Sequence, residues 1–382
     1  MRVLLNGINA ISAGGSSVVR NIVEILPVKL PEIHFDLIIP NINKYYNLPS
    51  MSNLSVYYFN RQKFHSLNRL IDIKYRIKEL GKKYKADLCF TLGDLGPIKL
   101  DIPHLVLLQQ AIFVYVNEDY EKLWKFKDRI KFSYSRQLFK QMSKNTNMFT
   151  VQTPVMAKRL NEVYNINNNK IVIVPSIVPF QGSLNKDCPD NNIIIDSVNK
   201  PCRLLFLSAP YPHKNFQILP KVMMEIKKRK LNEKIHFFLT IPNKSRFGNK
   251  TLRSLLPYSD CLTNLGELKS NEVPGAIKSS SALFLPTLVE SFGLIYLEAM
   301  KYECPIITSD RDFSRWMCGE SAIYFDPLDE NSIVNNLEKF CNDKFYNKYI
   351  NKANQRLNYF PNSWDDVAYK YSQIIVKMLN KK

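Results

Sequence analysis

The stretch of residues 284–309 constrains the fold of this chain more than any other. It reads Phe-Leu-Pro-Thr-Leu-Val-Glu-Ser-Phe-Gly-Leu-Ile-Tyr-Leu-Glu-Ala-Met-Lys-Tyr-Glu-Cys-Pro-Ile-Ile-Thr-Ser. An apolar run ends in Pro-Thr, a loop carries Glu290, and Gly293 opens a helical segment that bears Glu298. A second apolar run follows. The order strand, turn, helix, strand is the unit from which parallel α/β sheets are built.

The two glutamates of this stretch predict a site for a polyhydroxylated, anionic ligand. Each helical residue advances by about 100°, so a spacing of eight leaves Glu290 and Glu298 only about 80° apart. The first helical turn offers unpaired N–H groups and a partial positive charge, which favour an anion. The residues at this helix mouth are Ser291, Phe292, Gly293 and Leu294. Carboxylates bind pairs of hydroxyl groups, so two of them beside an anion site suit a nucleotide-sugar. The alternative is that Glu290 and Glu298 are ordinary surface charges of a helix, which is common for an isolated pair.

The motif also resembles a known family. Glu-Ser-Phe-Gly-Leu-x-x-x-Glu-Ala-Met, followed by Pro-Ile-Ile-Thr-Ser, resembles the E-x7-E signature of retaining GT-B glycosyltransferases of family 4, also called glycosyl transferases group 1. Further segments resemble the family's elements in the same order, namely Gly14-Gly15, residues 150–153, 171–175, 202–215, 265–267 and 310–327. The resemblance implies two Rossmann-like α/β/α domains whose parallel sheets face each other across a cleft.

Roles for individual residues follow from the resemblance. It implies that Glu290 contacts hydroxyls of the donor sugar, that Glu298 holds the ribose, and that Lys214 stabilises the leaving diphosphate. Glu290 and Lys214 are therefore the predicted catalytic residues. The other donor-binding residues are Gly14, Gly15, Ser208, His213, Gly266, Glu267 and Ser291 to Leu294. The family typically works without a bound metal, so neither a metal nor a further cofactor is expected.

The chain departs from the family at two positions. An Arg usually precedes the diphosphate-binding Lys by five or six residues, where this chain has Ser208 and Ala209. A His usually follows a strand of the amino-terminal domain, where this chain has Gln109 and Gln110. Either Gln can contact a sugar, but neither can act as a general base. The alternative that the chain is an altered protein, which binds sugar nucleotides or glycans without turnover, therefore stays open.

Apolar runs alternate with helical stretches along the whole chain, as in parallel α/β folds. We expect strands at residues 2–6, 35–39, 55–59, 88–91, 104–108, 148–152, 170–174, 203–207, 236–240, 262–265, 282–285 and 306–308. The predicted domains are an acceptor-side domain (1–178), a linker rich in Pro, Gly, Asn and Asp (179–199) and a donor domain (200–360). A last helix (361–382), capped by Ser363, is expected to return to the amino-terminal domain.

Cysteine usage and hydropathy indicate a cytoplasmic protein. The seven cysteines show no C-x-x-C spacing, which argues against a zinc site or a disulfide framework and fits a reducing compartment. No apolar run approaches the ~20 residues that span a bilayer. The amino end reads as a strand and a Gly turn, without the longer apolar core of a signal peptide.

The formal charge of +19 points to an anionic partner. Arg61–Lys85 holds nine Lys or Arg against two acids, and Lys122–Lys144 holds eight, with Asp128 as its one acid. Both stretches mix aromatic residues with the cations, a composition that suits an anionic membrane surface. A solvated basic face whose aromatics pack in the core explains the pattern as well. No nucleic-acid recognition module is found, so no nucleic acid is expected.

The sequence thus predicts a glycosyltransferase that is retaining and independent of metal. Its donor would be a nucleotide-diphosphate sugar and its acceptor a glycan or a lipid-linked molecule, in the synthesis of surface polysaccharide or glycolipid. The expected location is the cytoplasm, with peripheral attachment to the inner face of the membrane as an option. The alternatives are the non-catalytic binder, a nucleotide-sugar epimerase on the same architecture, and a basic nucleic-acid-binding protein.

Overall fold

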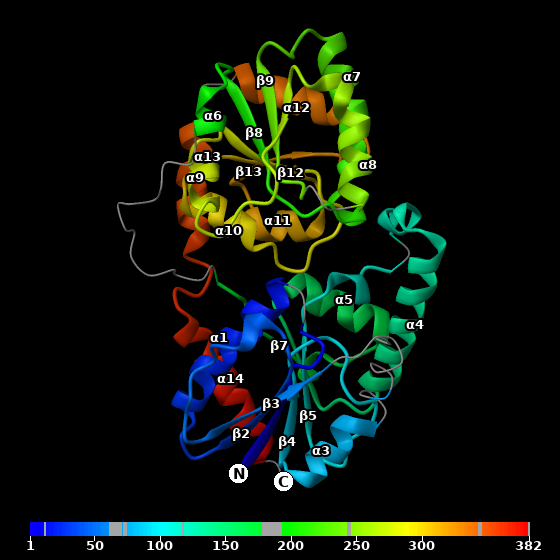
Figure 1. Cartoon of the computed structure of the whole chain (residues 1–382), viewed down its shortest axis with the longest axis vertical. Coiled ribbons are helices and arrows are strands. Elements are labelled where there is room, and N and C mark those ends of the chain that lie inside the picture. Colours follow the sequence, from blue (N-terminus) through cyan, green and yellow to red (C-terminus); the bar gives the residue numbers. More distant parts are fainter. Residues whose placement is uncertain are drawn as a thin grey trace. The chain divides into compact units, whose positions relative to one another are not determined.

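A computed structural model describes residues 1–10, 13–60, 71, 75–116, 118–177, 193–242, 246–342 and 346–380. The chain forms two compact units, each built around its own sheet (Figure 1). Unit 1 comprises Met1–Val116, Lys125–Pro179 and Pro361–Lys382, and unit 2 comprises Asn117–Trp124 and Phe180–Phe360. Most of the predicted linker 179–199 lies outside the described residues. Its last part forms helix α6 (Ile193–Ser197), where Asp196 accepts a hydrogen bond from Ser279 of unit 2 at 2.9 Å.

The sheet of unit 1 has seven parallel strands in the order β3-β2-β1-β4-β5-β6-β7. The register sets Val3 opposite both Phe35 and Leu88. Because the central strands are covered on both faces, they read as unbroken apolar runs. The strands are β1 (Arg2–Asn6), β2 (His34–Pro40), β3 (Leu54–Phe59), β4 (Leu88–Thr91), β5 (His104–Leu108), β6 (Met148–Val151) and β7 (Ile171–Ile173).

Helices cover both faces of this sheet, since side chains of a strand alternate between the faces. Val3 and Leu5 pack in one core with residues of α1 and α14, whereas Leu4 packs in a second core with Ile77 of α3. The helices of unit 1 are α1 (Ala13–Lys29), α3 (Ile77–Lys83), α4 (Phe126–Ser143), α5 (Pro154–Tyr164) and α14 (Trp364–Leu379), with short 3-10 turns η1 (Asn43–Tyr45), η3 (Ala111–Phe113) and η5 (Asn168–Lys170).

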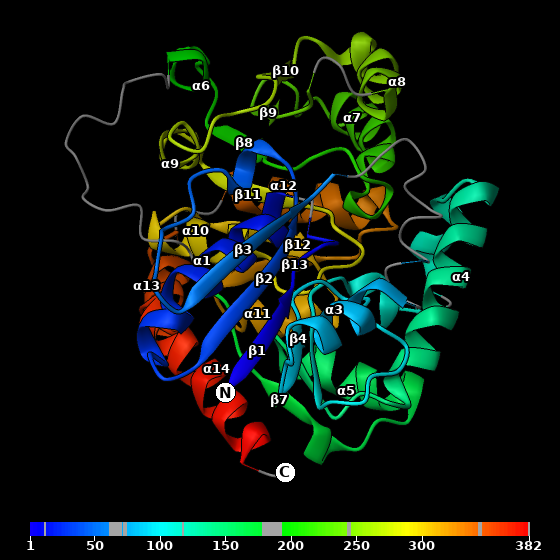
Figure 2. The same cartoon turned by 60° about the horizontal axis from the view of Figure 1, so that its bottom comes forward.

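Helix α14 completes unit 1 from the far end of the sequence. It runs beside α1 in both views (Figures 1 and 2), and Tyr371 packs against Phe90 with ring centroids 5.4 Å apart. Ser363 caps the helix as predicted: its side chain accepts from the Asp366 N–H, and the Asp366 carboxylate accepts from the Ser363 N–H, each at 3.1 Å. This reciprocal capping box satisfies backbone groups that a helix end leaves unpaired.

Unit 2 holds a sheet of six parallel strands in the order β10-β9-β8-β11-β12-β13. The strands are β8 (Cys202–Phe206), β9 (Ile235–Leu239), β10 (Leu262–Asn264), β11 (Ala282–Leu285), β12 (Ile306–Ser309) and β13 (Ala322–Phe325). The longer helices are α7 (Leu219–Lys228), α8 (Arg246–Leu255), α9 (Val273–Lys278), α10 (Leu294–Lys301), α11 (Asp312–Cys318), α12 (Glu330–Asn342) and α13 (Tyr346–Leu357). The 3-10 turns are η4 (Asp119–Leu123), η6 (Pro212–Lys214), η7 (Phe216–Ile218) and η8 (Leu256–Tyr258).

All the predicted strands are present, and none of their ends differs from the prediction by more than one residue. Strand β13 was not predicted. It is a four-residue edge strand in which Ile323 and Tyr324 are only half-buried. Gly14 and Gly15, expected in a turn before a helix, lie instead inside the first turn of α1. Glycine in a helix costs only about 1 kcal/mol relative to alanine, and the following residues Val18, Val19 and Ile22 pack in the core, so the helix forms across the pair.

One cysteine prediction is wrong. Cys202, at the start of β8, and Cys341, near the end of α12, form a disulfide with Cα atoms 5.8 Å apart. Their sequence separation of 139 leaves no local spacing signal, so only the fold brings the two sulfurs together. The thiols of Cys89, Cys261, Cys304 and Cys318 are free and buried.

Candidate active site at the carboxyl edge of the unit 2 sheet

Strands β8 and β11 are neighbours in unit 2, but the chain leaves them toward opposite sides of the sheet. From β8 it continues to β9 and β10, and from β11 to β12 and β13. The register pairs Leu204 with Ala282, and the two strands run parallel. Loops that follow such a pair diverge at the carboxyl edge, which is where open α/β sheets bind ligands. Lys214 follows β8 and Glu290 follows β11.

Lys214 and Glu290 form an ion pair at this edge, through Lys214 Nζ and a Glu290 carboxylate oxygen. The side chains are 17% and 20% exposed. The other Glu290 oxygen accepts from the backbone N–H of Ser291 at 3.1 Å. Burial opposes ionisation of Glu290, but the charge and hydrogen bond of Lys214 outweigh it and lower the pKa of the carboxyl. The Glu290 carboxyl is therefore ionised near neutral pH.

Backbone contacts fix the loop that presents Lys214. The Leu288 N–H of the β11 loop donates to the His213 carbonyl at 2.8 Å, which ties the two loops together. Asn215 adopts a left-handed conformation with φ of 62°, and its side-chain amide donates to the Pro327 carbonyl at 2.7 Å. Burial and the adjacent Lys214 charge lower the pKa of His213 to about 4. His213 is thus neutral near pH 7.

Gly293 turns the chain into helix α10. Its φ is +78°, in the left-handed region, and a Cβ there would lie 2.7 Å from a ring carbon of Tyr296. Tyr296 is itself fixed, because its hydroxyl lies 2.8 Å from that of Thr308 on β12. Phe292 is buried beside Phe360, with the ring centroids 6.0 Å apart. The helix mouth predicted from sequence is therefore a rigid turn.

Glu298 lies on α10 and is half-buried. Burial raises the pKa of its carboxyl to about 7, against a small opposing effect of Lys301. Among the described residues, no hydrogen bond or ion pair joins its side chain to the protein. A half-buried carboxylate with unused acceptors suits a ligand that brings hydroxyl donors.

The remaining donor-side residues lie at neighbouring strand ends. The Ser208 N–H donates to the Thr240 hydroxyl at 3.1 Å, so the loops after β8 and β9 are linked. Gly266, after β10, has φ of +80°, and apart from its chain neighbours no atom of the described residues lies within 4 Å of the position of a Cβ. Glu267 beside it is exposed. Open space beside a flexible backbone position allows a ligand to approach closely.

Gln109 and Gln110 follow β5 in unit 1, where Asp94 organises them. One Asp94 oxygen accepts from the backbone N–H groups of Gln109 and Gln110 at 2.7 and 2.8 Å. The other accepts from the Gln110 side-chain amide at 2.7 Å. Asp94, a buried acid with φ of 51°, was not predicted, because its partners Gln109 and Gln110 follow another strand and only the fold brings them to it.

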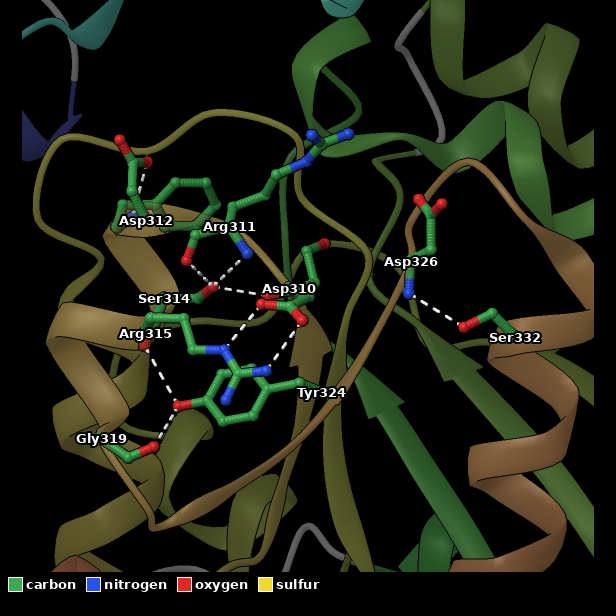
Figure 3. A network of polar contacts seen from close by, with 11 residues as sticks. Asp310, Arg311, Asp312, Ser314, Arg315, Gly319, Tyr324, Asp326 and Ser332 are labelled. Atoms are coloured by element: carbon green, nitrogen blue, oxygen red, sulfur yellow. Dashed lines mark hydrogen bonds and ion pairs between the residues drawn. The ribbon is translucent and has the colours of Figure 1, made fainter.

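The loop between β12 and α11 adds charged side chains to the same edge of unit 2 (Figure 3). Arg315 donates two hydrogen bonds to Asp310, at 2.6 and 2.8 Å, and its guanidinium stacks 3.8 Å from the ring centroid of Tyr324. Arg311 stands at the start of α11. Residues 310–327 resemble the family in sequence, but none of them was predicted to belong to the site.

No metal-binding constellation is found in the described ranges: no three or more His, Cys, Asp or Glu residues gather in a way that could hold an ion. None of the helices in those ranges combines the length and hydropathy of a transmembrane span.

Comparisons with known proteins match part of this chain to a family. Residues 191–356 match the family model described as glycosyl transferases group 1. The O-antigen chain mannosyltransferase RfbU of Salmonella typhimurium is 24% identical over 211 residues, which cover 54% of this chain and 55% of that protein. The chain thus aligns with only about half the length of this relative.

Solved structures show the same fold over the whole chain. Sucrose-phosphate synthase from Thermosynechococcus elongatus superposes with a TM-score of 0.73 at 14% identity, over 100% of both chains. HepE from Anabaena, solved with UDP and glucose, superposes with a TM-score of 0.68 at 12% identity, again over 100% of both. Residues 191–356 therefore match the glycosyl transferases group 1, within a chain that has the GT-B fold.

Proposed function

We propose that this chain transfers a sugar, with retention of configuration, from a nucleoside-diphosphate sugar to a hydroxyl group of a glycan or lipid-linked acceptor. The observation that carries the proposal is the Lys214–Glu290 ion pair, which unites the loops of β8 and β11 at the point where the sheet topology diverges. The family match of residues 191–356 supports the same reaction class.

The pair suits the charge changes of glycosyl transfer. The bond between the anomeric carbon and the diphosphate breaks, and the acceptor hydroxyl oxygen takes its place while its proton passes to the leaving diphosphate or to water. Negative charge collects on the leaving diphosphate as the bond breaks. Lys214 stabilises that charge as a fixed cation, so the reaction needs no metal at this position. Glu290, ionised and oriented by Ser291, accepts hydrogen bonds from hydroxyls of the donor sugar.

Glu298 completes the donor site as the acceptor for the ribose hydroxyls. Its carboxylate has no partner among the described residues, and its raised pKa reflects a charge that burial leaves uncompensated. Two hydroxyl donors from a ribose would supply that compensation. The Anabaena protein of the same fold was solved in complex with UDP and glucose, which supports a uracil nucleotide as the first donor to test.

The acceptor proposal rests on a relative and on one helix. The mannosyltransferase relative is named for the O-antigen chain, which supports surface polysaccharide as the context. On α4, Phe126, Ile130 and Tyr134 repeat at helical spacing and are 75%, 54% and 48% exposed. Lys125, Lys127, Arg129 and Lys131 surround this apolar stripe and are exposed too. An apolar stripe among cations fits peripheral attachment to an anionic membrane and a lipid-linked acceptor.

Donor binding gives the direct test of this function. Purified protein is screened by thermal shift against UDP, GDP, ADP, CMP and dTDP and their sugars, because a ligand that binds the native state raises its melting temperature. A selective shift that is lost in Lys214→Ala and Glu298→Ala, and kept in Lys339→Ala on the exposed face of α12, supports the proposal. No shift with any nucleotide would refute it.

A measurement of turnover distinguishes a glycosyltransferase from a protein that only binds sugar nucleotides. The alternative is a GT-B protein that binds sugar nucleotides without transfer, and two observations favour it: Ser208 and Ala209 stand where the family has an Arg, and Gln109 and Gln110 stand in place of the His. Release of free nucleoside diphosphate from the donor, abolished by Glu290→Ala, excludes that rival. Conversion of the donor sugar with no acceptor present would instead indicate an epimerase.

A further inference from the structure

The loop after β12 carries a cation whose main chain is held rigidly. Arg311 is the second residue after the strand ends at Ser309. Its N–H donates to the Ser309 carbonyl at 3.0 Å and lies 3.2 Å from the Ser314 hydroxyl oxygen, and the same hydroxyl lies 2.9 Å from the Arg311 carbonyl. The base of the side chain is therefore fixed before any ligand binds.

The side chain of Arg311, unlike its backbone, has an unpaired hydrogen-bond donor among the described residues. Its Nε is buried and has no hydrogen-bond partner within the described part of the chain. Arg315, one helical turn later, donates from its Nε and one Nη to the two carboxylate oxygens of Asp310. In Figure 3 the Arg311 side chain extends away from that Asp310–Arg315 pair. A buried donor without a partner costs free energy, and an anion bound by the same guanidinium would offset that cost.

The fold brings Arg311 to the Lys214 region of unit 2. The strand order β8-β11-β12 places the Lys214, Glu290 and Arg311 loops at the same edge, on strands spaced about 5 Å apart. Turn η4 gives a second link, since it packs against η6, which carries Lys214. Asp119 of η4 lies close enough to Arg311 for that charge to lower the pKa of Asp119, after the larger effect of Lys122.

At the carboxyl edge of the unit 2 sheet, the side chains of Lys214, Glu290 and His213 together supply little positive charge for a diphosphate. Lys214 is paired with Glu290, so the two contribute no net charge. His213 is neutral near pH 7, because burial and Lys214 depress its pKa. A leaving diphosphate is a multiply charged anion, and a guanidinium offers a planar set of donors that matches phosphate oxygens.

We propose that Arg311 is a second diphosphate-binding cation, supplied by the β12 loop in place of the Arg that is absent at Ser208 and Ala209. The inference rests on the proposed donor-binding function and adds a residue to it. Arg311 acts with Lys214 on the phosphates, while the nucleoside is held elsewhere in the site.

Calorimetric titration of the full chain tests the assignment. The ligands are UDP, GDP and ADP and the corresponding nucleosides, and the variants are Arg311→Ala, Arg311→Lys, Lys214→Ala and Asp119→Asn. Arg253→Ala, an exposed residue of α8, is the matched control for loss of one positive charge. For the diphosphate that the wild type binds best, Arg311→Ala should raise Kd by roughly 10–100-fold, the range expected for lost charge-assisted hydrogen bonds. Arg311→Lys should recover part of the affinity, and nucleoside binding should stay the same.

The outcomes separate this assignment from the function on which it rests. Wild-type binding of a diphosphate that Lys214→Ala loses and Arg311→Ala retains would overturn the role of Arg311 and leave the proposed function standing. If Asp119→Asn reproduces both the affinity loss and the melting temperature of Arg311→Ala, the role of Arg311 is to hold η4, and the assignment is wrong. If the wild type binds no diphosphate, both proposals fail.

Discussion

At the scale of single residues, the candidate site depends on two positions with opposite demands. Gly293 is present because the backbone there is left-handed and a neighbouring ring occupies the space of a Cβ. Glu298 keeps a carboxylate in a half-buried place where no described residue pairs with it. Steric contact restricts position 293 to glycine. At position 298, burial of the carboxylate costs free energy until a ligand pairs with it. Each of them gives a measurable prediction.

Gly293→Ala should destabilise unit 2 by about 2–4 kcal/mol, because it adds a steric clash to the cost of a left-handed alanine. Gly266→Ala is the matched control: its φ is also positive, but its Cβ would meet open space, so only the conformational cost of about 1–2 kcal/mol remains. Chemical denaturation gives both free energies of unfolding. Equal losses in the two variants would contradict the role given to the Tyr296 ring.

Glu298→Gln should change how stability depends on pH. Burial raises the pKa of Glu298 from 4.5 to about 7, so between these values the folded state holds a proton that the unfolded chain has released. The free energy of unfolding of the wild type therefore falls as pH rises through this window. Glutamine cannot release a proton, so the variant should gain about 1–3 kcal/mol on the wild type between pH 4.5 and pH 8. Denaturation curves recorded across this pH range measure the free energy of unfolding, with the exposed Glu267→Gln as control. The prediction is contradicted if the free energy changes with pH equally in the wild type and in Glu298→Gln.

At the scale of elements, sequence periodicity predicted the strands well, because parallel strands buried on both faces leave short apolar runs. It failed where an element has weaker burial or depends on distant partners. The edge strand β13 and the disulfide between β8 and α12 are of this kind. The spacing of Glu290 and Glu298 is a local pattern, so their place in the site could be predicted from sequence. The roles of Asp94 and Arg311 depend on neighbours that are distant in sequence, so they could not.

Helix α4 gives an element-scale prediction about membranes. Of the basic stretch Arg61–Lys85, residues 61–70 and 72–74 lie outside the described residues, so the test concerns α4 alone. The double variant Phe126→Ser, Ile130→Ser should lose most of its binding to vesicles that contain anionic phosphatidylserine, because the stripe supplies the apolar contact. Vesicle flotation measures the bound fraction, and neutral phosphatidylcholine vesicles should bind little of either protein.

Tyr369→Ser, which removes an aromatic ring that is 57% exposed on α14, controls for the loss of an exposed ring elsewhere in unit 1. Equal binding by the wild type and the double variant would remove α4 from the membrane proposal.

The cap of α14 gives a second prediction at this scale. Ser363→Ala removes a hydroxyl that accepts from the Asp366 N–H and should cost about 1 kcal/mol of stability. Ser133→Ala, at an exposed position inside α4, should cost nothing, since alanine is the better helix former there. Thermal unfolding of unit 1 that is unchanged by Ser363→Ala would show that packing alone holds the helix start.

At the scale of the whole molecule, the disulfide joins the first strand of unit 2 to one of its last helices. Alkylation of the unfolded, unreduced protein should modify at most five of the seven cysteines, and all seven after reduction, as mass spectrometry would show. Reduction should also destabilise the fold by about 2–4 kcal/mol, because it releases a long closed loop in the unfolded chain. Seven modified cysteines without reductant would contradict the pairing.

The return of α14 to unit 1 sets an order on biosynthesis. A ribosome completes every strand of unit 1, and then residues 180–360 of unit 2, before it makes the helix that packs beside α1. Until then the apolar surface that Ile375 and Tyr371 later cover faces water or a chaperone. The domain that is begun first is thus the last to be finished, and the nascent chain carries it incomplete through the synthesis of its neighbour.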